Sequence, residues 1–478
     1  MATSRPSLGN LPEELLVQII EYSTLEGFCY IPRDHVYRIR RVYSDLTSLS
    51  LVCHRFHRLA TPFLYQGISL YDGHPHSSDN KEYSIVPPCP RALALHRVLR
   101  DNPPLRSMCL DLEMVFDDEA EITDEDFRVA NDLVSWLGRT QSLRLYGGFP
   151  WGGSDSGQRE NTLGLIYYAT RSMTNLKEFL LDMGNDTNEG LSLLEAMEYI
   201  NFPSLEILSM TGNGHSEDWR PMPSSNSEEP RTAPFTCLSL AYCKDSVEAI
   251  EKCISWPKDL VDFTINTSGN EEVAHLSLMD AQSWLLNHKE TLKYAYIDLL
   301  GHNQGIQEFD ASIFPRLESL TLSRTQLNDD VGDGVQNNLC WESSHPDRLL
   351  PPNLKTFGMS FGILGCCLIN NFGDKEVSWL RQLGQAAASR QSSLETIDIL
   401  FQPWSEYPHK YGNYPDDHGY PWDRMSGLRD ELAEYGISLI YTPAPWTKEE
   451  WEERIAKWLK GSARARFEHQ SGHEQGYY

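Results

Sequence analysis

The sequence predicts an α/β repeat solenoid, with parallel strands inside and helices outside, preceded by a small all-α module. Two apolar series at helical spacing lie near the N-terminus, a short leucine pattern then returns along the chain, and helical stretches separate its copies. We therefore expect an N-terminal module at residues 1–70 and a solenoid at 71–445. A capping helix and a polar, disordered tail are expected at 446–478.

The N-terminal module is predicted from two apolar series. Leu11 and Pro12 lie at the start of the first, where proline fits a first helical turn and two glutamates follow it. The residues that recur one turn apart are then Leu15, Leu16, Ile19 and Ile20. The second series, Leu46, Leu49, Val52, Cys53, Phe56 and Leu59, fits one helix that ends at Pro62. Two such helices cannot bury all this surface against each other, so a following domain or a partner covers the excess.

The two series carry paired motifs. The first begins Leu-Pro-Glu-Glu-Leu-Leu, and the second ends Leu-Val-Cys-x-x-Phe-x-x-Leu. Together they resemble an F-box, the motif by which substrate receptors of Skp/cullin/F-box ubiquitin ligases bind the Skp adaptor. The resemblance implies that the adaptor-binding residues are Leu11, Pro12, Leu15, Leu16, Ile19, Val52 and Cys53.

An insertion at residues 27–45 separates the two motifs by more than the short connection usual in that family. It carries four arginines among aromatic residues, a composition that nucleic-acid sites also have. We interpret it as a solvated loop or an extra helix, because the chain as a whole is acidic. A loop of this length costs little closure entropy, but by its position it could mask the adaptor surface.

Charge and composition exclude several classes of partner. The chain has 41 Lys and Arg residues against 68 Asp and Glu residues, which gives a net charge of −27 and argues against nucleic acid or an anionic membrane. Its ten cysteines form no C-x-x-C pair, so we expect reduced thiols in the cytoplasm or the nucleus. We see no secretory signal and no apolar run long enough for a membrane span.

The repeated pattern reads Leu-x-x-apolar-x-apolar, often followed by Asn, Cys or Thr. Clear copies begin at Leu205, Phe235 and Leu317, and weaker ones at Leu105, Leu176, Leu260, Leu292, Leu354 and Leu394. They fit the leucine-rich repeat, whose strands line the inside of a horseshoe and whose helices lie outside. A doubly wound α/β enzyme would also alternate strands and helices. It would show continuous Val and Ile runs and a glycine-rich phosphate loop, which this sequence lacks.

Side chains alternate along a strand, so the residues between the apolar positions should lie on the concave face. They are polar, with scattered acids and two tyrosines. We expect a substrate segment of basic character to bind near Tyr294 and Tyr296. Asp262, Asp298 and Thr321 are predicted to lie beside them.

No catalytic, metal or cofactor site is predicted. His54 and His57 have a spacing that a metal could use, but we interpret them as surface or packing residues because no further ligand pair is near. The adjacent Cys366 and Cys367 lie in an apolar stretch and are interpreted as structural. The sequence contains no G-x-S-x-G, H-E-x-x-H or Walker motif, so we predict that the chain is not an enzyme.

The combined features resemble fungal-type F-box proteins with C-terminal leucine-rich repeats. The resemblance implies a substrate receptor that binds the Skp adaptor, and through it a cullin, and holds a protein substrate on the repeats. Two alternatives stay open. A leucine-rich-repeat scaffold without a ligase role would pack Leu11, Pro12, Leu15 and Val52 against its own solenoid, and an F-box protein could also act outside ubiquitination.

Overall fold

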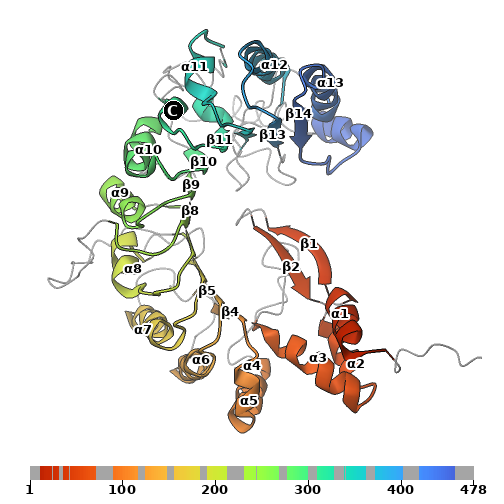
Figure 1. Ribbon diagram of the computed structural model, residues 1–478, viewed down its shortest axis with the longest axis vertical. Helices are drawn as coiled ribbons and strands as arrows, with labels where there is room; N and C mark the ends of the chain where they lie inside the picture. Colours follow the sequence, from red (N-terminus) through yellow and green to blue (C-terminus); the bar gives the residue numbers. More distant parts are fainter. Residues whose placement is uncertain are drawn as a thin grey trace, which may run out of the picture. The chain divides into compact units, whose positions relative to one another are not determined.

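The computed structural model describes the greater part of the chain. The described residues are 11–23, 25–31, 36–41, 43–70, 90–116, 124–147, 156–183, 191–212, 231–243, 245–267, 277–299, 309–327, 339, 341–361, 372–401 and 419–457. Twelve strands form one parallel sheet in the order β3 to β14 (Figure 1). The chain divides into two compact units, Met1–Leu260 and Val261–Tyr478, which are described in turn.

The first unit opens with three helices, α1 (Glu13–Ser23), α2 (Tyr43–Ser50) and α3 (His54–Gln66). Two antiparallel strands, β1 (Leu25–Ile31) and β2 (Val36–Arg41), lie between α1 and α2 in the chain. The predicted insertion therefore contains a strand pair, and the expectation of a loop or an extra helix was wrong for its described residues. β-Branched and aromatic residues in both segments favour strands.

The second apolar series does not form the single helix that the sequence predicts. Backbone hydrogen bonds of 3.2 and 3.1 Å close a turn at Leu51 and Val52, and Cys53, in an extended conformation, begins α3. Pro62 was also predicted wrongly as the end of a helix, since it lies inside α3. Pro62 removes one helix hydrogen bond and crowds the carbonyl group one turn earlier, but α3 packs on α1 and α2, and this packing supports the helix past the proline.

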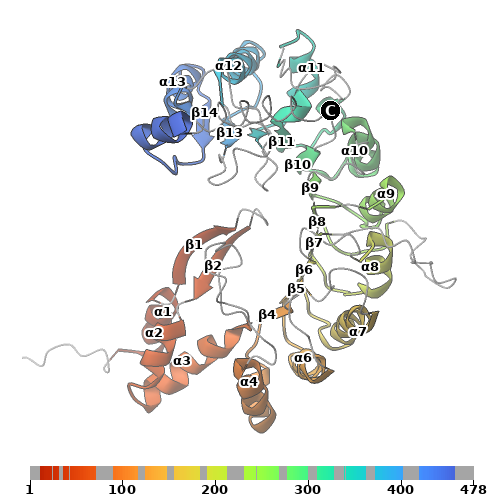
Figure 2. The same cartoon turned by 180° about the vertical axis from the view of Figure 1, so that it is seen from behind.

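The repeats of the first unit follow. Their elements are β3 (Gly67–Ser69), α4 (Pro90–Asp101), α5 (Pro103–Arg106), β4 (Asp111–Phe116), α6 (Asp124–Trp136), β5 (Ser142–Gly147), α7 (Ser156–Ser172), β6 (Glu178–Asp182), α8 (Leu193–Tyr199), β7 (Ile207–Thr211), β8 (Cys237–Ala241) and α9 (Val247–Ser255). The apolar residues at the alternating pattern positions, such as Leu143 and Leu145, are fully buried. Helices α6 to α9 lie along one side of these strands in both views (Figure 1 and Figure 2).

Asp245 connects two helices of the first unit, α8 and α9, which β7 and β8 separate in the chain. It is buried, and its carboxylate accepts hydrogen bonds from the amide of Leu193 at 2.5 Å and from that of Ser246 at 2.8 Å. These amides lie at the starts of α8 and α9, where helix N–H groups lack partners within the helix. The nearby Cys243 thiol bonds the backbone of Asp245, as expected for a cysteine at this repeat position, and burial raises the pKa of that thiol to about 12.

The second unit repeats the same plan. Its elements are β9 (Asp262–Thr267), α10 (Leu278–Leu285), β10 (Tyr294–Leu299), β11 (Ser319–Ser323), α11 (His345–Leu349), β12 (Thr356–Ser360), α12 (Asp374–Ser389), β13 (Thr396–Leu400), α13 (Pro421–Ala433) and β14 (Ser438–Tyr441), with short 3₁₀ turns η4 (Leu286–His288), η6 (Ala311–Ile313) and η7 (Arg324–Leu327). Helices α10 to α13 lie on one side of its strands (Figure 1). With the first unit, this arrangement confirms the predicted α/β repeat solenoid.

Arg324 and Glu376 form a buried ion pair between two layers of the second unit. The two side chains are 1% and 6% exposed, and Arg324 Nε donates to Glu376 Oε1 at 2.6 Å. Glu376 Oε2 accepts from the amide of Gly373 at 2.8 Å and so caps the start of α12. The pair therefore fixes α12 to the turn that follows β11.

A further helix occupies residues 448–457 after the last strand. It begins at a capping box, in which the Thr447 amide donates to Glu450 Oε2 at 2.8 Å and the Glu450 amide donates to Thr447 Oγ1 at 3.3 Å. Trp451 and Ile455 bury one face of this helix. The tail predicted beyond it lies outside the described residues. No described helix is long and apolar enough to cross a membrane.

Candidate functional site

The helices of the N-terminal module share a small core. Leu16, Ile20, Leu46, Leu59 and Ala60 are buried together, and Leu11 and Phe56 pack partly against them. Two arginines of α3 hold the start of α1 in place. Arg55 Nη2 donates to the carbonyl of Leu11 at 2.7 Å, and Arg58 forms an ion pair with Glu13. These contacts fix the orientation of α1 on α3, with Leu16 and Ile20 turned into the core.

Several apolar residues of the module are exposed. Pro12, Leu15, Ile19 and Tyr22 recur at spacings of three and four residues, and we call this set the apolar stripe. Leu15 and Ile19 are 45% and 44% exposed, and Tyr22 is 77% exposed. Leu51 and Val52, in the turn between α2 and α3, are 79% and 65% exposed, and Cys53 beside them is exposed too. Exposed large apolar groups in such numbers indicate an interaction surface.

Two of the seven predicted adaptor-binding residues are placed differently from the rest. Leu16 has no exposed surface, because it faces the core of the module instead of the apolar stripe. Leu11 is half-buried against the same core. Tyr22 and Leu51 are also exposed and are not among the seven predicted residues. The spacing from Ile19 could have identified Tyr22, and Leu51 lies within the second motif.

The core position of Leu16 leads to a test. We expect Leu16→Ala to destabilise the N-terminal module by about 2–5 kcal/mol, because it removes buried methyl groups and leaves a cavity. The same change at the exposed Leu15 should alter stability by less than about 0.5 kcal/mol. Urea unfolding of the full-length chain, followed by far-UV circular dichroism, measures both. Equal effects of the two substitutions would contradict this assignment.

The N-terminal module was compared with models of known protein families. Residues 8–71 match the family described as F-box-like. The matched span contains α1, α2, α3 and both exposed sets of apolar residues. A comparison with curated proteins found no match to the chain.

F-box domains bind Skp-type adaptors, and the F-box-like domain indicates a role in substrate recognition by a ubiquitin ligase. F-box proteins are typically adaptors for substrates and not enzymes. The exposed apolar residues lie in the domain that this partner would contact.

The strands of the second unit offer another surface. Residues that alternate with the buried apolar ones lie on the face that no described helix of this unit covers, here called the helix-free face (Figure 2). The register of the strands arranges them in three rows. The first row, Asp262, Tyr294, Ser319, Thr356 and Thr396, is exposed or half-buried, whereas the third row, Asn266, Asp298, Ser323 and Ser360, is buried.

Tyr296 and Asp298, two of the predicted substrate-binding residues, are buried at 8% and 1% exposure. Tyr296 Oη lies 2.9 Å from Ser360 Oγ and donates to Asp298 Oδ2 at 3.2 Å. Burial raises the pKa of Asp298, while hydrogen bonds from Ser323, Tyr296 and Ser360 act in the opposite direction. Tyr296 and Asp298 therefore form part of a buried hydrogen-bond network beneath this surface. Asp262, Tyr294 and Thr321 are at least partly accessible.

The second row contains Thr264, Tyr296, Thr321, Gly358 and Asp398. Asp398, on β13, is not among the predicted substrate-binding residues. It lies between Ile397 and Ile399 in a repeat copy that the pattern already marks, so the alternation could have placed it. Burial raises the pKa of this carboxyl group from 3.8 to about 6. A shift of this kind is common at functional sites.

The raised pKa of Asp398 predicts a pH dependence of stability. A folded-state pKa near 6 against 3.8 means that the folded chain binds the proton more tightly, so this contribution is present below pH 3.8 and is lost as the pH rises through about 6. We expect Asp398→Asn to raise the free energy of unfolding at pH 7 by up to about 3 kcal/mol, and by little at pH 4. Urea unfolding at both values measures this. A stability difference that does not change with pH would contradict it.

On the corresponding face of the first unit, one arginine lies among acidic side chains. Arg144 on β5 is 15% exposed and lies 3.5 Å from Asp111, 4.0 Å from Glu113 and 3.9 Å from Glu178. These strands are neighbours in the sheet, so the four side chains form one network across it. The guanidinium group offsets part of the local acidic charge.

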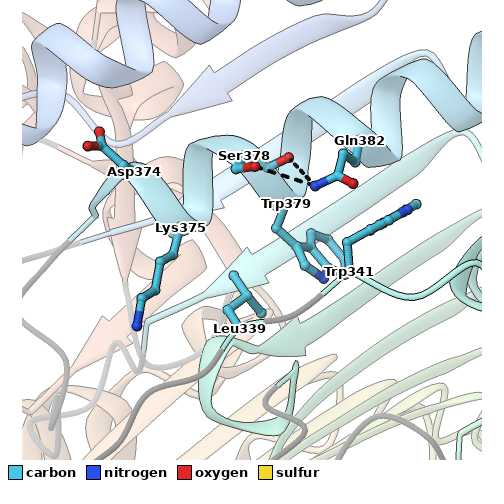
Figure 3. A pocket seen from close by; sticks show the side chains of 7 residues that line it. All are labelled: Leu339, Trp341, Asp374, Lys375, Ser378, Trp379 and Gln382. Carbon is cyan, nitrogen blue, oxygen red and sulfur yellow. Dashed lines mark hydrogen bonds between the residues drawn. The ribbon is translucent and has the colours of Figure 1, made fainter.

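A pocket of about 260 Å³ lies beside α12 in the second unit (Figure 3). It is lined by Leu339, Trp341, Asp374, Lys375, Ser378, Trp379 and Gln382. Three of its polar side chains form hydrogen bonds within the protein: Gln382 Nε2 donates to Ser378 Oγ at 3.4 Å, and Arg424 Nε donates to Asp374 Oδ1 at 3.2 Å. The buried Trp379 Nε1 has no hydrogen-bond partner among the described residues. Within the described part of the chain, no group of three His, Cys, Asp or Glu residues could hold a metal ion.

Proposed function

We propose that this chain is the substrate-recognition subunit of a Skp/cullin/F-box ubiquitin ligase. The observation that carries the proposal is the apolar stripe and the Leu51–Cys53 turn, exposed within a domain that matches the F-box-like family. Pro12, Leu15, Ile19, Val52 and Cys53 are the proposed adaptor contacts. Tyr22 and Leu51 are added to them on the basis of their exposure.

The repeats would hold the protein substrate on the helix-free face. Tyr294 is an exposed aromatic residue there, and Asp262 and Thr321 lie in the adjoining strands. Aromatic side chains at such positions are favoured in binding hot spots. The cullin would bind through the adaptor, and ubiquitin transfer would belong to the other subunits, as in F-box proteins with leucine-rich repeats.

A leucine-rich-repeat scaffold without a ligase role is the alternative. Such a scaffold has no partner for the exposed residues of the F-box-like domain and is expected to pack them against itself. Pro12, Leu15 and Val52 are instead exposed, and Leu11 packs partly against the core of the module itself, which favours adaptor binding.

The test is direct binding of the full-length chain to purified Skp adaptor, measured by size-exclusion chromatography with light scattering. We expect a stable complex with one copy of each protein. A folded chain that fails to bind the adaptor would overturn the ligase proposal and leave the scaffold as the better account.

A further inference from the structure

Asp398 lies in the middle of β13, and its neighbours on the two adjacent strands differ in chemistry. In the register of the sheet it pairs with Gly358 on β12 and with Ile440 on β14. Gly358 has no side chain, and the Thr321 side chain covers it so closely that a Cβ atom there would lie 2.2 Å from Thr321 Oγ1. Ile440 is 54% exposed. The carboxylate thus has a hydroxyl group toward one side and an exposed apolar side chain on the other.

Among the described residues, Asp398 forms no ion pair, and the lysines that precede β10 and β12, Lys293 and Lys355, pair with Glu318. Across β9 to β14, the described positions of the helix-free face carry three acids, Asp262, Asp298 and Asp398, and no Lys, Arg or His. Asp298, buried in the sheet, also has an unsatisfied oxygen atom. Its Oδ1 has no hydrogen-bond partner among the described residues. The first unit differs, because Arg144 lies among the acids of its own face. A partly buried carboxylate without a cation is costly, and a cation from a partner would remove that cost.

We propose that Asp398 is the anchor for a lysine or arginine side chain of the bound protein substrate. The cationic head would bind the Asp398 carboxylate, and the aliphatic stem would pack on Ile440. Thr321 Oγ1 provides a second acceptor one strand beyond Gly358. This inference rests on the proposed function, since it specifies the substrate that the helix-free face takes.

The test uses a phage-displayed library of random dodecapeptides, selected on the immobilised full-length chain. We expect enriched peptides to share a basic residue at one position. A synthetic peptide from that set should lose about tenfold or more in affinity when the chain carries Asp398→Asn, or when its own basic residue is replaced by methionine. Ile440→Ala should weaken the same peptide several-fold, because the stem loses its apolar contact.

Glu395→Gln is the matched control. Glu395 lies three residues before Asp398, is exposed, and precedes β13, so its substitution should change peptide affinity by less than about twofold. Asp398→Lys, as a charge reversal, should shift the selection toward acidic peptides. Thermal unfolding confirms that each variant is folded before it is used.

The outcomes separate the inference from the proposed function. Enriched peptides without a shared basic residue, or with equal affinity for the wild-type and Asp398→Asn chains, would overturn the Asp398 anchor and leave substrate binding by the repeats in place. A selection in which no peptide is enriched on the folded chain would contradict both. Adaptor binding is measured separately and depends on neither result.

Discussion

Replacing Leu15, Ile19 and Val52 together by alanine is expected to abolish binding of the Skp adaptor by the full-length chain. All three side chains are exposed in the F-box-like domain. Truncating a large apolar side chain in a desolvated interface costs about 1.5–3 kcal/mol, so the triple change should weaken binding by at least about 4 kcal/mol, close to a thousandfold. Isothermal titration calorimetry with purified adaptor measures the loss.

The control for this variant is a pair of apolar residues exposed elsewhere in the same unit. Tyr167 and Tyr168 on α7 are 43% and 47% exposed, and changing both to alanine should leave adaptor affinity within about twofold. Circular dichroism establishes that the triple variant is folded. Adaptor binding that survives the triple substitution would place the contact surface elsewhere on the domain.

The second large effect is expected at the buried ion pair of the second unit. Arg324→Met leaves the Glu376 carboxylate buried without its cation, which should lower the free energy of unfolding by about 3–5 kcal/mol. Adding Glu376→Gln should recover part of this loss, because the second substitution removes the unpaired charge. Urea unfolding of the full-length chain at pH 7 gives both values.

Arg381 and Glu431 provide the matched comparison. They form an ion pair between α12 and α13, but their side chains are 36% and 45% exposed. Water and salt screen such a pair, so Arg381→Ala should cost less than about 1 kcal/mol. If Arg324→Met and Arg381→Ala had equal effects, burial would not be the source of the difference.

The repeat architecture was predictable because leucine alternation is a local signal. Leu208, Met210, Leu320 and Leu322 fall on the buried side of their strands as the pattern requires. The break at Leu51–Cys53 and the continuation through Pro62 were not predictable from spacing. Tertiary packing decides both, since an apolar residue in a turn and one in a helix fit the same period.

The candidate surfaces were only partly predictable for a related reason. Adjacent apolar residues such as Leu15 and Leu16 look alike in the sequence, and only the packing of α1 on α3 decides which one is buried. On the strands, the alternation predicts the face of the sheet on which a side chain lies, but it does not predict how deeply that side chain is buried. It could not distinguish the exposed Tyr294 from Tyr296, whose hydroxyl group is buried in a polar network.

The hydrogen bonds of the Asp245 carboxylate should affect how the first unit unfolds. Because it accepts hydrogen bonds from the starts of both α8 and α9, neither helix can detach without leaving a buried charge unsatisfied. In repeat proteins, strong coupling between neighbours makes unfolding spread through adjoining repeats. The repeats that contain α8 and α9, together with β7 between them, should therefore exchange their amide hydrogens as one cooperative block, even though the repeats are irregular in length.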